Sequence, residues 1–174
     1  MIFKSKGNSN MMGETIRMDE TIRKYSADAT RFACADAGDT LYDACFDTAD
    51  VAIVGLANEE NWINETLAGV SALRTGDDLN FMDKVLMNET NRLVKATEDS
   101  FAAMQFREGL QKGWFEMMIA RNEYRSWCSD GGVSMHEAVV RKWIESVIIL
   151  ICPICPHWSE KMWKAVGKEG LAIK

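Results

Sequence analysis

The chain has 174 residues, of which 47% are hydrophobic and 26% are charged, with 12 glycines and 2 prolines. These proportions exclude a disordered or low-complexity protein. They indicate a compact domain, long enough to bury a core without disulfides or a structural metal. The net charge of −6 excludes a protein that coats nucleic acid by charge alone, because phosphate binding needs a clustered positive surface.

Charge is distributed unevenly along the chain. Residues 1–103 hold 18 acidic and 10 basic side chains, whereas residues 104–174 hold 8 and 10. We therefore expect a polyanion to bind the C-terminal part, and we expect no DNA partner. No apolar run reaches the roughly 18 residues of a membrane span and no signal peptide is evident, so we expect a cytoplasmic protein without a membrane partner.

The first predicted elements are helices. Residues 15–46 are predicted to form two short helices, Thr15 to Tyr25 and about Ala27 to Ala37, before an acidic turn. Asp28 and Arg31 lie one turn apart in the second helix and are predicted to pair. A longer helix follows from Asp47, with Asn58, Glu59 and Asn61 outside and an apolar stripe made of Ala49, Ala52, Ile53, Leu56, Ile63, Leu67 and Val70.

The rest of the chain continues the helical pattern. A helix is predicted from about Asn80 to Met104, and another ends at the glycines 131–132, with Phe106, Leu110, Gly113, Trp114, Met117, Ala120, Tyr124 and Trp127 on one stripe. Ser134 is predicted to cap the next helix with Glu137 in a capping box, and its apolar face holds Val140, Trp143, Ile144, Val147, Ile148 and Ile151. Pro153 and Pro156 should end that helix before a last one from His157 to Val166. The sequence thus predicts an all-α fold, a helical bundle.

Two cysteines form a Cys-x-x-Cys motif at Cys152 and Cys155. A thioredoxin-like redox centre would need a parallel βαβ core, which the sequence does not predict. A zinc site with His157 would need a fourth ligand from Cys34, Cys45, Cys128 or His136, none of which forms a second close pair. Both alternatives stay open, but we favour buried thiols at a helix kink and expect no metal.

Several blocks resemble one family in the correct order. The sequence KSKGN at 4–8 resembles the second half of the KMSKS signature of class I aminoacyl-tRNA synthetases, although the first signature lysine, methionine and serine are absent. The segment 25–39, YSADATRFACADAGD, is similar to the region after that loop in leucyl-tRNA synthetase of the eukaryotic cytosolic and archaeal type. Further blocks of that family are LRTG at 73–76, FREGL at 106–110, ARNEYR at 120–125 and PICPH at 153–157.

The resemblance implies a leucine–tRNA ligase fragment. Residues 1–46 would be a remnant of the catalytic domain, with the KMSKS-like loop, and residues 47–174 the anticodon-binding-type bundle. Lys4 would be catalytic, since a lysine ammonium stabilises charge developing on pyrophosphate, and Lys4, Ser5 and Gly7 would bind ATP. The intact enzyme would use ATP with Mg²⁺. The family's nucleotide-binding core, HIGH motif and editing domain have no counterpart here, so we expect the isolated chain to be inactive and to bind no cofactor.

The implied partners are tRNA(Leu) and the remaining synthetase domains. A phosphate backbone would be contacted by basic side chains of the C-terminal part, namely Arg121, Arg125, Arg141, Lys142, Lys161 and Lys164. The alternative function is a non-catalytic bundle that binds tRNA or another protein.

Overall fold

The chain folds into a helical bundle with one small strand pair. The computed structural model describes residues 3–4, 15–16, 18–38 and 46–172. Strands β1 (Phe3–Lys4) and β2 (Thr15–Ile16) pair antiparallel. The helices are α1 (Met18–Tyr25), α2 (Ala27–Ala37), α3 (Phe46–Ala68), α4 (Phe81–Ala102), α5 (Phe106–Leu110), α6 (Met117–Asp130), α7 (Glu137–Ile151) and α8 (Pro156–Ala165), with a 3₁₀ turn at Val70–Ala72 and a π-helical segment at Gln111–Glu116.

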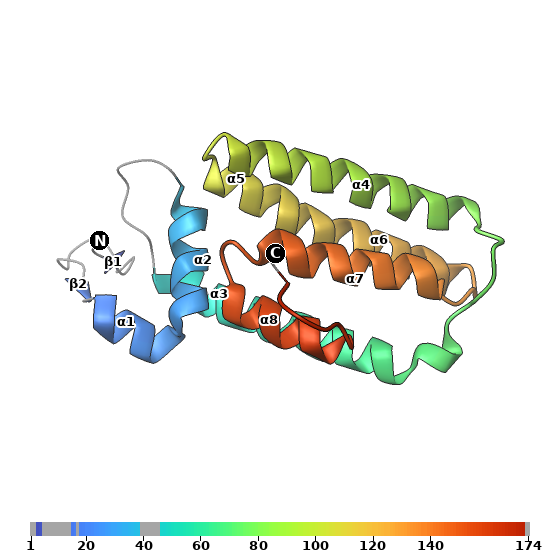
Figure 1. The fold of residues 1–174 in the computed structure, drawn as a ribbon, viewed down its shortest axis with the longest axis horizontal. Helices are drawn as coiled ribbons and strands as arrows, with labels where there is room; N and C mark the ends of the chain where they lie inside the picture. Colours follow the sequence, from blue (N-terminus) through green and yellow to red (C-terminus); the bar gives the residue numbers. More distant parts are fainter. Residues whose placement is uncertain (1–2, 5–14, 17, 39–45, 173–174) are drawn as a thin grey trace.

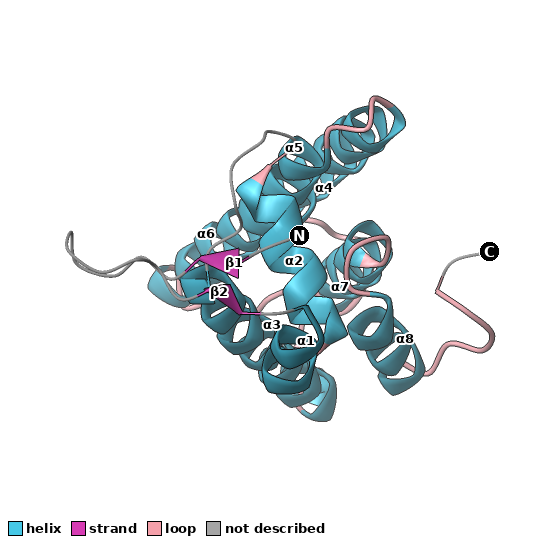
Figure 2. Ribbon diagram, turned by 90° about the vertical axis from the view of Figure 1, so that its left-hand side faces the viewer, coloured by secondary structure: helices cyan, strands magenta, loops and turns pink. Residues whose placement is uncertain are grey.

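The long helices run side by side. Helices α3, α4, α6, α7 and α8 follow the long axis of the molecule, and α2 crosses one end of the bundle (Figures 1 and 2). The all-α prediction is confirmed, as is each predicted helix from α1 to α8. One start was wrong: Thr15 lies in β2, and the first helix begins only at Met18. No helix in the described ranges is long and apolar enough to cross a membrane.

Helix α7 forms the centre of the core. All six of its predicted apolar positions are buried, from Val140 to Ile151. The Trp143 indole Nε1 donates a hydrogen bond to the Met117 carbonyl oxygen at 3.0 Å, which satisfies the one polar atom of this buried ring. Each such large apolar side chain contributes roughly 1.5–3 kcal/mol when fully buried.

Helix α3 buries most of the predicted face, with two differences. Ala49, Ala52, Leu56 and Ile63 are buried as expected, but Ile53 is 37% exposed and Glu59 is only 4% exposed. Buried positions follow alternating steps of three and four residues, and Glu59 occupies one of these steps. The prediction that Glu59 lies outside was wrong: a charged residue was expected to be exposed, although its helical spacing from Leu56 and Ile63 places it on the buried face.

Helices α4, α5 and α6 form a tight antiparallel hairpin. Asn80 caps α4, and its side chain and that of Asp83 form the reciprocal hydrogen bonds of a capping box. A Cβ atom on Gly109 would lie 2.3 Å from the Phe101 ring, so glycine permits the close approach of α5 to α4. The helix from Phe106 to Asp130 is continuous through its π-helical segment, but the predicted stripe members Phe106 and Trp127 are exposed.

The start of α7 differs from the prediction. The helix begins at Glu137 with His136 as its N-cap residue and without a side-chain cap, so the Ser134 capping box was wrong. Tertiary contacts hold this end instead. The Arg74 Nε donates to the Ser134 carbonyl at 2.6 Å, and the backbone of Arg74 pairs with that of His136.

Helix α2 belongs to the same core as the bundle. Phe32 is buried and lies edge-on to Trp114 and Phe115, with ring centroids 6.0 and 5.9 Å away. The proposed boundary between residues 46 and 47 therefore does not coincide with a break in packing, and it stays a prediction drawn from the family resemblance.

Candidate nucleic-acid interface

Helix α8 carries two of the predicted tRNA-binding lysines, Lys161 and Lys164. Pro156 occupies the first turn, where its missing N–H costs no hydrogen bond. An open groove of about 750 Å³ runs along the helix and is lined by Pro156, His157, Glu160, Lys161, Lys164 and Ala165. The Lys161 ammonium pairs with Glu60 of α3 at 2.5 Å, whereas Lys164 is exposed and has no ion pair within the described chain.

Helices α6 and α7 add three further cations. Arg141 is half-exposed and pairs with Glu137 one turn earlier, with Nε and Oε1 2.7 Å apart. Lys142 is half-buried and Arg125 is exposed, and neither has an ion pair in the part of the chain that the structure describes. An ion pair offsets part of a cation's charge, and Arg125, Lys142 and Lys164 have no such pair within the described residues.

Arg121 is a correction to the sequence prediction. This side chain is 7% exposed and lies inside the bundle, so it cannot contact a phosphate backbone. Its guanidinium pairs with Glu59 at 2.6 Å and stacks on the Trp62 and Trp143 rings, 4.1 and 5.0 Å from their centroids. Burial raises the pKa of Glu59, although the charge and hydrogen bond of Arg121 oppose this shift.

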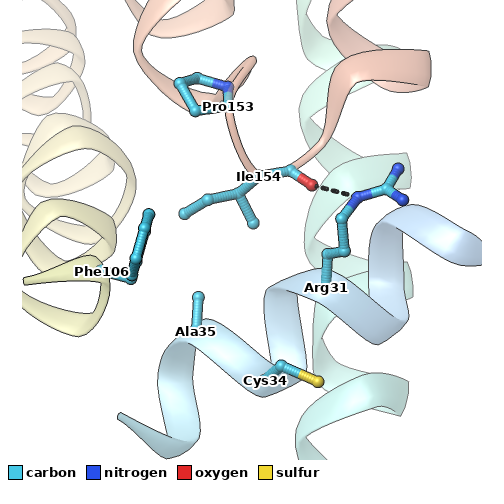
Figure 3. Close-up of a pocket in the computed structure, with 6 residues that line it drawn as sticks. All are labelled: Arg31, Cys34, Ala35, Phe106, Pro153 and Ile154. Atoms are coloured by element: carbon cyan, nitrogen blue, oxygen red, sulfur yellow. Dashed lines mark hydrogen bonds between the residues drawn. The ribbon is translucent and has the colours of Figure 1, made fainter. Parts of the chain in front are cut away.

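Asp28 connects α2 to the start of α8. Its carboxylate is nearly buried and accepts hydrogen bonds from Arg31 at 2.6 Å and from the Trp158 backbone N–H at 2.7 Å, while the His157 Nδ1 lies 2.9 Å away. The predicted Asp28–Arg31 pair is thus confirmed. Arg31 also donates through Nε to the Ile154 carbonyl at 2.9 Å (Figure 3).

A second network joins the far end of the bundle. Asp83 is fully buried and accepts hydrogen bonds from Arg74 at 2.8 Å and from the Tyr124 hydroxyl at 2.5 Å. The Tyr124 hydroxyl in turn accepts the His136 backbone N–H at 2.8 Å. Burial would raise the pKa of Asp83, but the hydrogen bonds from Tyr124, the Asn80 amide and Arg74 outweigh it and hold this pKa below its ordinary value. The sequence prediction missed this network.

The cysteine pair is confirmed as buried. Cys152 and Cys155 are at most 1% exposed, and burial raises the pKa of both thiols, which is the opposite of the activation that a redox cysteine needs. Both are free thiols, and the Cys155 Sγ lies 3.7 Å from the Asp28 carbonyl oxygen. Within the described ranges no cluster of three His, Cys, Asp or Glu side chains is placed to hold a metal ion.

The predicted ATP-binding residues fall at the edge of the described chain. The backbone of Lys4 lies in β1, whereas Ser5 and Gly7 lie outside the described residues. Their assignment to an ATP site therefore rests on the family resemblance alone.

One family model matches the helical bundle. Residues 83–174, more than half of the chain, match the family model described as the anticodon-binding domain of tRNA ligase. The chain belongs to this family.

Similar proteins specify the resemblance further. The chain is 38% identical to the cytoplasmic leucine–tRNA ligase of Arabidopsis thaliana, over 99% of this chain and 16% of that protein. It is 36% identical to that of Saccharomyces cerevisiae, over 91% of this chain and 14% of the yeast protein. The chain thus spans about one sixth of the length of these relatives.

A solved structure shares the fold. The agnB2 LeuRS of Agrobacterium radiobacter K84, in a ternary complex with tRNA and LeuAMS, matches 91% of this chain and 20% of its own with a TM-score of 0.67. The sequence identity of 15% supports the fold only.

Proposed function

We propose that this chain is the part of a cytoplasmic leucine–tRNA ligase that comprises the end of the catalytic domain and the anticodon-binding bundle, and that it docks tRNA(Leu). The observation that carries this proposal is the similarity over 99% of the chain to a leucine–tRNA ligase. That similarity includes the N-terminal 82 residues, which precede the match to the anticodon-binding family model.

The docking surface would be formed by the exposed cations of α6, α7 and α8. Lys164 and Lys161 lie nearly one turn apart along the open groove of α8, a spacing that suits successive contacts with one phosphate backbone. Arg125, Arg141 and Lys142 would extend the surface. Binding would be weak and sensitive to salt, because a few lysine and arginine contacts release only a few counterions.

The remaining domains of the ligase would supply the nucleotide-binding core, with ATP and Mg²⁺ as its cofactors. Lys4 would stabilise negative charge on the departing pyrophosphate, and Ser5 and Gly7 would shape the loop around it. The chain's own described residues would contribute through Asp28, which ties the helix after this loop to the helix of the docking groove. The position of the loop would thus be set relative to the bound tRNA.

Fluorescence anisotropy with a tRNA(Leu) transcript tests the docking surface. The double variant Lys142→Glu, Lys164→Glu should weaken binding and lower the slope of log K against log salt by about 0.9 for each cation lost. The matched control is Lys84→Glu, Lys95→Glu on α4, which should change binding little. A larger loss in the control, or no binding by the parent chain at low salt, would contradict the proposal.

A separate assay tests the catalytic assignment. The 174-residue chain should show no leucine-dependent exchange between ATP and pyrophosphate, because one lysine loop cannot position both reactants. Exchange above background would show that this chain holds a complete activation site, contrary to the fragment proposal.

A further inference from the structure

The outer face of α4 and α6 carries a groove that the tRNA proposal does not use. It has a volume of about 430 Å³ and is lined by Val85, Asn88, Glu89, Glu116, Ile119, Ala120 and Glu123. Two of its large apolar side chains are exposed, Val85 at 40% and Ile119 at 55%. Exposed apolar side chains gathered in one hollow indicate a binding surface.

The charge of this groove is negative. Three of its lining side chains are glutamates, and no lysine or arginine lines it. Arg92 pairs with Glu89 and Glu116, and Lys112 pairs with Glu116 and Glu108, so two cations face three carboxylates. Glu123 has no ion pair within the described ranges. Such a field repels phosphates, so the groove is unsuited to RNA.

Aromatic side chains extend the apolar stripe on both helices. Phe81 lies one turn before Val85 on α4 and is 76% exposed, and Trp127 lies one turn after Glu123 on α6 and is 39% exposed. Apolar positions spaced by helical turns match the spacing that an amphipathic helix presents. Tryptophan and other aromatic side chains are frequent anchors of protein interfaces.

We propose that the α4–α6 groove binds a basic amphipathic helix of a protein partner. Apolar side chains of that helix would cover Val85 and Ile119, and its lysines or arginines would pair with Glu123 and be attracted by the other glutamates of the groove. The proposal does not depend on tRNA docking, because none of the side chains that line the groove belongs to the proposed tRNA surface, and α4 and α8 lie at opposite edges of the bundle (Figure 1).

Anisotropy with a labelled model peptide tests the groove. The probe is a peptide of roughly 18 residues, five helical turns, with leucines on one face and lysines on the other. Ile119→Lys and Glu123→Lys in the full 174-residue chain should each weaken its binding at least about tenfold. Matched controls are Ile149→Lys, at an isoleucine 44% exposed on α7, and Glu65→Lys on α3, which should stay within about twofold.

Further measurements distinguish a basic helix from other molecules that could bind in the groove. A peptide with glutamates in place of the lysines should not bind, and far-UV circular dichroism should show that all variants stay folded. Equal losses in the groove variants and their controls would overturn the proposal. Sedimentation that shows a dimer of the parent chain, dissociated by Ile119→Lys, would also overturn it, because a second copy would then cover the groove. The same holds if a tRNA transcript displaces the peptide from the parent chain and binds the Glu123→Lys variant more tightly.

Discussion

Replacing Glu59 by glutamine should destabilise the bundle more than the loss of any surface charge. The change keeps the size of the side chain but removes Glu59, the one ionic partner that Arg121 has among the described residues; Arg121 is 7% exposed. Breaking a buried ion pair by removing one partner costs about 3–5 kcal/mol. Asn122 and two tryptophan rings continue to contact the guanidinium, so we expect a cost near the lower end, about 3 kcal/mol.

The double variant Glu59→Met, Arg121→Met should recover most of this loss. It leaves no charge at the position of this pair, and well-packed apolar side chains of similar volume commonly replace a buried ion pair at little or no cost. The double variant should therefore be more stable than Glu59→Gln, although two substitutions in a core would ordinarily destabilise more than one. This reversal distinguishes the cost of an unpaired charge from the cost of disturbed packing.

Urea unfolding provides the measurement. Tryptophan fluorescence reports the site directly, because Trp62 and Trp143 flank the guanidinium, and far-UV circular dichroism reports the helices. A loss below about 1 kcal/mol for Glu59→Gln would refute the reasoning, since that value belongs to a solvent-exposed pair. Weakened tRNA binding by Arg121→Met with unchanged unfolding free energy would also refute it, because Arg121 would then be a docking residue.

Three further predictions concern the core. Asp83→Asn should lower the unfolding free energy at neutral pH, and the difference in unfolding free energy from the parent, measured in urea, should shrink as the pH falls below about 4. The pKa of Asp83 in the folded state lies below the ordinary 3.8, so the stabilisation by its ionised form is present above 3.8 and is lost as the pH falls through the folded-state pKa. Cys152 and Cys155 should react slowly with a disulfide reagent in the native state and fast in denaturant, and equal rates would show that they are accessible. Gly109→Ala should lower the unfolding free energy by about 1–3 kcal/mol, because the added methyl meets the Phe101 ring. Gly55→Ala should raise it by about 0.5–1 kcal/mol, because its added methyl meets nothing closer than 4.0 Å. Thermal melting that ranks the two variants in the other order would contradict the packing described here.

Helical periodicity predicted the elements because each long helix buries one continuous stripe. Every predicted apolar position of α7 is buried, and both ends of α4 were predicted within two residues. The same rule applied strictly to α3 would have placed Glu59 inside, at the step between Leu56 and Ile63. A buried carboxylate at such a step predicts a buried cation elsewhere in the chain, but spacing alone does not identify Arg121 as that cation.

Long-range partners were beyond the reach of local patterns. Asp28 and Arg31 are three residues apart, so their pairing follows from helix geometry, whereas the Trp158 amide lies 130 residues away in sequence. The start of α7 was missed for the same reason, because Arg74 and Tyr124 hold it from other elements. Four of the family-like blocks, at 25–39, 73–76, 120–125 and 153–157, contain residues of these internal networks, so these blocks serve internal contacts whether or not they also take part in the proposed docking.

The Asp28 carboxylate has a consequence for synthesis of the chain on the ribosome. Its main-chain donor, the Trp158 amide, is made 130 residues after Asp28 itself. Until α8 emerges, Arg31 is the only partner of the Asp28 carboxylate among its described contacts, and an incompletely satisfied charge is unfavourable to bury. Helix α2 should therefore dock late, after α3 to α7 have assembled, and a nascent chain that stops before residue 158 should leave its first two helices undocked and open to proteolysis.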